Sequence, residues 1–80
     1  MSDRLTVTLY IPCYNGEAYI AGCIESVLRQ FRRPDEILVI DDGSTDRTAE
    51  IAARYDKVRV IRHERNRGLA AARNTALAAA

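Results

Sequence analysis

The fold of this chain follows from the stretch Ile37-Leu-Val-Ile-Asp-Asp-Gly-Ser-Thr-Asp46, in which four apolar residues run directly into two carboxylates and a hydroxyl-rich turn. A short apolar run before such a turn predicts a parallel strand that is buried on both faces. Open α/β sheets bind their ligands at the carboxyl ends of their strands. Adjacent carboxylates at that edge repel each other and lose hydration, so they need compensating donors. Asp41 and Asp42 are therefore candidate site residues.

Strand-like and helix-like segments alternate on both sides of this stretch. Runs of β-branched and aromatic residues predict strands at 6–11, 36–41 and 58–61. Apolar residues at helical spacing predict helices at 18–30, from 43–46 to about Tyr55, and from Leu69 onward. Asn15 and Gly16 supply the turn and a cap before the first helix, and Ser44 or Thr45 is the expected cap of the second.

This order of elements predicts an α/β fold, a three-layer Rossmann-like βαβαβα unit with a parallel sheet. The chain has 80 residues, which suffices for one small domain. Its last residues, Ala76-Leu-Ala-Ala-Ala80, stop inside a helix pattern without a capping residue. We therefore expect residues 1–80 to be the truncated N-terminal half of a larger domain. An uncovered sheet edge or face would favour a homo-oligomer.

Composition and cysteine spacing exclude several classes of protein. The net charge is +1 and no basic run is present, which gives no reason to expect nucleic acid as a partner. No segment approaches the roughly 18 continuous apolar residues of a membrane span, and the first residues lack the apolar region of a signal peptide. Cys13 and Cys23 match neither a metal-binding nor a redox spacing. These features favour reduced cysteines and a cytoplasmic location.

Common phosphate-binding and hydrolase motifs are missing. The first strand is followed by Pro12-Cys-Tyr-Asn-Gly16 instead of a dinucleotide-binding G-x-G-x-x-G, and the single lysine, Lys57, belongs to no P-loop. With no Gly-x-Ser-x-Gly elbow, the single histidine, His63, has no triad to join, and we expect it at a strand end or on the surface. A phosphoacceptor receiver would pair its carboxylates after the first strand, where this chain has Pro12 and Cys13.

Three motifs in order resemble the start of the inverting family 2 glycosyltransferases, which have the GT-A nucleotide-sugar-binding fold. The first is Val7-Thr-Leu-Tyr-Ile-Pro-Cys-Tyr-Asn15, followed in the helix by Ser26 and Gln30. The second is Glu36-Ile-Leu-Val-Ile-Asp-Asp-Gly-Ser-Thr-Asp46. The third is Asn66-Arg-Gly-Leu-Ala-Ala-Ala-Arg-Asn74. Together they cover Val7 to Asn74, and the shared order makes the resemblance specific.

The resemblance implies a nucleotide-binding role for part of these motifs. Pro12 and Tyr14 would lie along the base and ribose, Asp42 would accept a hydrogen bond from the base, and Arg73 would approach the base or the phosphates. Asp41 would brace the loop. The candidate nucleotide-binding residues are Pro12, Tyr14, Asn15, Asp41, Asp42 and Arg73.

These side chains also have structural interpretations. Tyr14 could plug the end of the sheet, and Arg73 could be a solvated helix residue. Asp42 could be a turn residue that accepts hydrogen bonds from the backbone of residues 43–45.

The resemblance further implies an NDP-sugar donor, with UDP the expected nucleotide, and direct displacement by an acceptor hydroxyl. Mg²⁺ or Mn²⁺ would act in the complete enzyme, but the metal-binding Asp-x-Asp motif and the catalytic base of the family follow later in the chain. We therefore expect no metal site, no catalytic residue and no sugar transfer in these 80 residues. The alternative is a non-catalytic α/β assembly module that does not bind nucleotide usefully.

Overall fold

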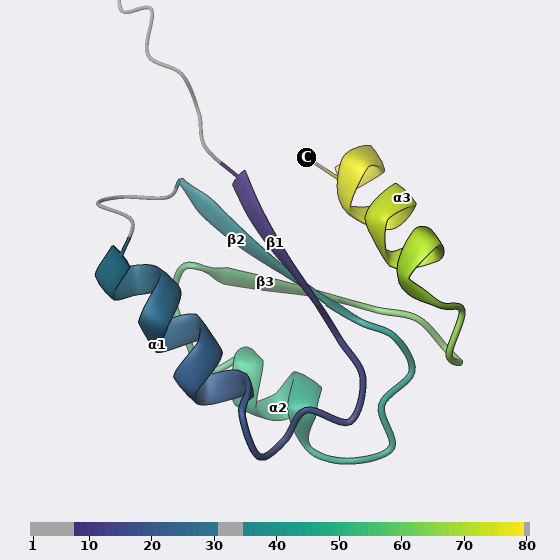
Figure 1. Ribbon diagram of the computed structural model, residues 1–80, viewed down its shortest axis with the longest axis horizontal. Coiled ribbons are helices and arrows are strands. Elements are labelled where there is room, and N and C mark those ends of the chain that lie inside the picture. Colours follow the sequence, from purple (N-terminus) through teal and green to yellow (C-terminus); the bar gives the residue numbers. More distant parts are fainter. Residues whose placement is uncertain (1–7, 31–34, 80) are drawn as a thin grey trace, which may run out of the picture.

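The computed structural model describes residues 8–30 and 35–79. Three parallel strands form one sheet in the order β1-β2-β3, with β1 at Thr8–Cys13, β2 at Glu36–Asp41 and β3 at Val58–Arg62. The helices α1 (Ile20–Gln30) and α2 (Thr48–Ala52) lie on one face of the sheet, and α3 (Leu69–Ala79) lies on the other (Figure 1). The three-layer βαβαβα fold predicted from the sequence is confirmed.

Strand β2 packs against helices on both faces of the sheet. Ile37, Leu38, Val39 and Ile40 are all 0% exposed. Val39 packs into the cluster below α1 and α2, whereas Leu38 and Ile40 pack against α3. Successive side chains of a strand point to opposite faces, so a strand covered on both sides needs a continuous apolar run. That is the feature from which this strand was predicted.

Helix α1 begins two residues later than the sequence predicts. A turn over residues 17–19 precedes it, closed by the N–H groups of Tyr19 and Ile20, which donate to the Gly16 carbonyl. Its buried side is formed by Ile20 and Ile24, spaced one helical turn apart.

Helix α2 is much shorter than predicted and has a different start. It ends at Ala52 instead of near Tyr55, and Arg47 occupies the N-cap position without a side-chain hydrogen bond that caps the helix. The prediction that Ser44 or Thr45 caps this helix is wrong. The Ser44 hydroxyl instead accepts a hydrogen bond from the Asn15 N–H, so it serves the neighbouring loop.

Helix α3 contacts the sheet through small side chains. Ala72 and Ala76 pack on Leu38 and Ile40, which lets the helix backbone lie close to β2. Its first residue agrees with the prediction. No helix among the described residues is long and apolar enough to cross a membrane.

Among the described residues, strand β1 lies at one edge of the sheet and runs through Pro12 to Cys13, although the sequence predicts that it ends before the proline. An edge strand tolerates proline because one side of its backbone has no strand partner. Tyr10 on this strand remains 42% exposed. Residues 6 and 7 of the predicted strand lie outside the described residues.

Candidate functional site

The loops that follow β1 and β2 are joined by backbone-to-side-chain hydrogen bonds. The Asn15 N–H donates to Ser44 Oγ at 2.8 Å, and the Thr45 N–H donates to Asn15 Oδ1 at 2.9 Å. The buried Gly16 N–H donates to Thr48 Oγ1 at 2.8 Å. Asn15 has a φ of 50°, a left-handed conformation that asparagine tolerates. These contacts hold the two loops as one unit at the carboxyl ends of β1 and β2.

Asp41 supports this unit from inside the protein. It is 0% exposed, and its Oδ1 accepts a hydrogen bond from the Ser44 N–H at 3.0 Å. Its Oδ2 makes no hydrogen bond but lies 3.6 Å from Arg62 Nε, while the guanidinium of Arg62 donates to the Ser44 carbonyl at 2.7 Å. A buried carboxylate is thereby balanced by a neighbouring cation. This geometry agrees with a bracing role for Asp41.

Asp42 links the end of β2 to the start of α3. Its Oδ1 accepts hydrogen bonds from His63 Nδ1 and the Arg67 N–H, and its Oδ2 accepts one from the Gly68 N–H, each at 2.8 Å. The partners are therefore not the backbone groups of residues 43–45 that a simple turn would use. A carboxylate at these N–H groups also suits the positive end of the α3 dipole.

The pKa of Asp42 depends on its burial and on its hydrogen bonds. Burial raises the pKa of the carboxyl, but the hydrogen bonds from His63, Arg67 and Gly68 outweigh burial and hold the pKa below its usual value. Asp42 is thus a carboxylate near neutral pH, with hydrogen bonds to three donors.

His63 lies at the end of a strand, one of the two positions that the sequence predicts. It follows the last residue of β3 and is buried, so of the two alternatives the strand end is confirmed and the surface is wrong. Its ring lies between Asp42 and Thr75, with Nε2 2.8 Å from Thr75 Oγ1. No local pattern around a single histidine indicates burial, because both ring partners come from distant parts of the chain.

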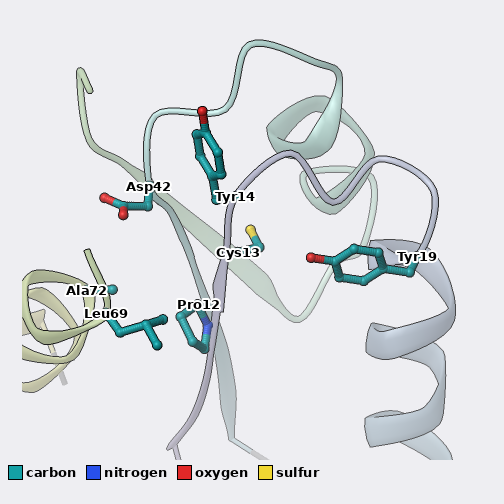
Figure 2. Close-up of a pocket in the computed structure, with 7 residues that line it drawn as sticks. All are labelled: Pro12, Cys13, Tyr14, Tyr19, Asp42, Leu69 and Ala72. Carbon is teal, nitrogen blue, oxygen red and sulfur yellow. The ribbon is translucent and has the colours of Figure 1, made fainter. Parts of the chain in front are cut away.

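A cavity of about 210 Å³ opens beside Asp42 at the carboxyl end of β1 (Figure 2). Tyr14 and Tyr19, which are 47% and 58% exposed, contribute aromatic rings. Figure 2 shows the Leu69 side chain extending from α3 toward Pro12. A whole drug-sized ligand needs about 300 to 1,000 Å³, so this cavity suits a part of a larger ligand. It is lined by Pro12, Cys13, Tyr14, Tyr19, Asp42, Leu69 and Ala72.

Three of the six candidate residues, Pro12, Tyr14 and Asp42, line this cavity. Asn15 and Asp41 lie in the hydrogen-bonded loops behind it, and Arg73 is exposed on α3, one position after the cavity residue Ala72. The predictions did not include Cys13, Tyr19, Leu69 and Ala72. Cys13, Leu69 and Ala72 lie within the motifs quoted above, which could have indicated them.

The described residues match a known family over almost their entire length. Residues 8–80 fit the model of glycosyl transferase family 2. The chain belongs to glycosyl transferase family 2. From Thr8 onward, the three motifs on which the resemblance rested lie within the matched residues.

In its bacterial relatives, the segment that matches this family 2 chain is a small part of a longer protein. The uncharacterized glycosyltransferase EpsJ of Bacillus subtilis is 46% identical over 78 residues, covering 92% of this chain and 22% of EpsJ. Chondroitin synthase of Escherichia coli is 43% identical over 75 residues, covering 89% of this chain and 11% of that protein. This chain therefore spans about a fifth or less of the length of these relatives.

A solved structure shares the fold of the family 2 chain. The crystal structure of S. aureus TarS 1-349 superposes with a TM-score of 0.83 and 33% sequence identity, covering 95% of this chain and 24% of that chain. The likeness confirms the predicted GT-A-type α/β fold.

The acidic pair of this family 2 chain does not form a metal centre. Within residues 8–30 and 35–79, no group of three or more histidine, cysteine, aspartate or glutamate side chains could hold a metal ion. Both oxygens of Asp42 accept hydrogen bonds from N–H groups, and Asp41 Oδ2 lies beside the cation of Arg62. Cationic and N–H partners at these oxygens compete with a divalent ion, so the residues present do not fit Mg²⁺ or Mn²⁺.

Proposed function

We propose that this chain is the nucleotide-binding segment of an inverting glycosyltransferase, which transfers a sugar from an NDP-sugar to an acceptor hydroxyl. UDP is the proposed nucleotide. The observation that carries the proposal is the cavity at the end of β1, where the exposed Tyr14 ring and the Asp42 carboxylate line one space. Family membership and the names of the relatives support the reaction class.

The roles of the side chains follow from their chemistry. Tyr14 offers a half-exposed aromatic face on which a base stacks, and Pro12 extends this apolar wall. Asp42 accepts a hydrogen bond from a base N–H, as a carboxylate does with the imide of uracil. Arg73 approaches the base or the phosphates from α3. Asn15 and Asp41 serve the nucleotide indirectly, by holding the loop that carries Tyr14.

The remaining parts of the reaction are assigned to residues outside this chain. We place the metal site for Mg²⁺ or Mn²⁺ and the catalytic base outside these 80 residues, because the three motifs resemble only the early segment of the family. The 80 residues alone are therefore proposed not to transfer sugar. A cytoplasmic location is proposed because Cys13 and Cys23 are both free thiols.

The test is a UDP titration of the isotopically labelled chain, with Mg²⁺ present and absent, followed by NMR. Saturable shifts of the amides near Tyr14, Asp42 and Arg73 are expected. Tyr14→Ala should weaken UDP binding by about tenfold, because an aromatic ring that stacks on a base contributes about 1–3 kcal/mol. Asp42→Asn is a less direct variant, since Asp42 also bonds the start of α3.

Tyr10→Ala is the matched control for this titration. Tyr10 is 42% exposed, close to the 47% of Tyr14, but it does not line the cavity. Its removal should leave UDP affinity unchanged. A folded wild-type chain without shifts, or equal losses in the two variants, would contradict the nucleotide-binding proposal.

A non-catalytic assembly module is the second candidate function. It is favoured by the edge position of β1 and by the exposed apolar side chains Tyr10, Leu69 and Leu77. Such surfaces recruit partners, so we propose that the chain forms a homo-oligomer through this edge or face. Light scattering over a concentration series tests this. A monomer mass that does not change with concentration would exclude it.

A further inference from the structure

The His63 ring connects three elements beside the cavity. His63 follows β3, its Nδ1 lies 2.8 Å from Asp42 Oδ1 at the end of β2, and its Nε2 lies 2.8 Å from Thr75 Oγ1 on α3. The His63 and Asp42 side chains are 6% and 8% exposed, so water is largely excluded from their contact. Neither His63 nor Thr75 lines the cavity itself.

The partners of the ring determine where its proton lies. Asp42 is ionised and can only accept, so His63 Nδ1 must carry the proton that bridges the two side chains. In the neutral ring Nε2 is then an acceptor, and the Thr75 hydroxyl donates to it. Asp42 thereby sets the tautomer, and Thr75 gives Nε2 a partner that holds the ring in place.

The hydrogen bonds of Asp42 leave little freedom to its carboxylate. A carboxylate offers about four acceptor positions. His63 and Arg67 occupy positions on Oδ1, and Gly68 occupies one on Oδ2. One acceptor position on Oδ2 remains for a ligand, and the donors on the other oxygen determine the orientation of the group.

We propose that His63, oriented by Thr75, is a positioning residue for nucleotide binding that holds the Asp42 carboxylate ready to accept a hydrogen bond from the base. The inference rests on the proposed function, because Asp42 serves there as the base acceptor. His63 acts through Asp42 and does not touch the ligand. Removing its Nδ1 donor leaves the carboxylate held only by the N–H groups of Arg67 and Gly68, and a binding group that is held less firmly binds more weakly.

Two amide variants separate the two ring nitrogens. In His63→Asn the side-chain amide nitrogen takes the place of Nδ1, so the donor to Asp42 is kept and the contact with Thr75 is lost. In His63→Gln the longer side chain reaches the place of Nε2, so the contact with Thr75 is kept and the donor to Asp42 is lost. Both variants lose the ring, and they serve as controls for each other.

The experiment measures UDP dissociation constants of the wild type and both variants by NMR, together with their thermal midpoints. We expect His63→Gln to bind UDP about tenfold more weakly than His63→Asn, as the loss of one charge-assisted hydrogen bond predicts. The Asp42 carboxyl carbon should titrate at a higher pH in His63→Gln than in His63→Asn. Thr75→Val removes the partner of Nε2 and should shift the imidazole Nε2 signal, whereas Thr75→Ser keeps the hydroxyl and should not.

The outcomes distinguish this inference from the proposed function. If the wild type binds UDP and both amide variants bind it equally, His63 is only a structural residue and the inference is overturned. A wild-type chain that is folded but does not bind UDP overturns the proposed function, and this inference with it. If His63→Gln binds UDP more weakly but is also less stable, with a lower thermal midpoint than His63→Asn, the weaker binding is explained by partial unfolding. The positioning role is then also rejected.

Discussion

Gly43 lies against the backbone of Arg65, so closely that a Cβ atom at position 43 would be 2.4 Å from the Arg65 carbonyl carbon. Gly43 also has a φ of 79°, which L side chains rarely adopt. The turn after Asp42 therefore packs directly on the segment that joins β3 to α3. The same segment provides the N–H groups of Arg67 and Gly68 that bind Asp42.

Gly43→Ala is expected to destabilise the fold by about 3 kcal/mol or more, since backbone strain is added to a clash with backbone atoms that cannot turn away. Urea unfolding followed by circular dichroism measures the loss. Gly68→Ala is the matched control, because Gly68 also has a positive φ, 91°, but a Cβ atom there meets nothing within 4 Å. It should cost only about 1 kcal/mol. Equal losses of unfolding free energy in the two variants would show that the close contact with Arg65 does not contribute to the destabilisation.

Thr48→Val should destabilise the chain by about 1–3 kcal/mol although it preserves the side-chain shape. The Thr48 hydroxyl accepts from the buried Gly16 N–H and donates to Asp46 Oδ1, so valine leaves a buried donor without a partner. Thr48→Ser keeps the hydroxyl and should retain most of the stability. Chemical denaturation of the wild type and the two variants measures the difference. A valine variant as stable as the serine variant would contradict a stabilising role of the hydroxyl.

Stability should fall in acid partly because of Asp42. Its pKa is lower in the folded chain than in the unfolded one, so the carboxylate stabilises the fold above its unfolded pKa, and this contribution disappears as the pH falls through the folded pKa. The window lies below about pH 4. Asp46 and Glu50 also have lowered pKa values and add to the same loss. The stability difference between wild type and Asp42→Asn, measured from about pH 7 to about pH 3, should therefore shrink in acid. A constant difference would refute this role.

Cys13 should resist alkylation in the folded chain. Burial, followed by the negative charge of Asp41, raises the pKa of its thiol to about 12, which leaves almost no thiolate near neutral pH. Cys23 is partly exposed and provides an internal control. Iodoacetamide labelling with peptide mapping should modify Cys23 first and Cys13 only after unfolding. Labelling of Cys13 at the rate of Cys23 under native conditions would contradict its buried position.

Part of this fold could be predicted from local patterns. The apolar run at Ile37 to Ile40 indicated a strand buried on both faces, and its bounds agree with β2. The start of α3 at Leu69 was predicted from helical periodicity after a glycine. Secondary structure of this kind is encoded within a few neighbouring residues. Parallel topology then follows from the order of the elements.

The length of α2 and the buried position of His63 could not be predicted in this way. Ser44 could have capped α2, but its hydroxyl accepts a hydrogen bond from the Asn15 N–H on the other loop. Local cap rules fail where a distant backbone group competes for the same side chain.

The sequence by itself determined the strands, the parallel order and the family to which the chain belongs, because periodicity and motif spacing are properties of neighbouring residues. Only the tertiary structure decided which candidate residues reach the cavity and which support it. Asp42 has partners 21, 25 and 26 positions away, and Asn15 has partners 29 and 30 positions away. Hydrogen bonds at such separations form only when the sheet brings its strand ends together, so no local pattern specifies them.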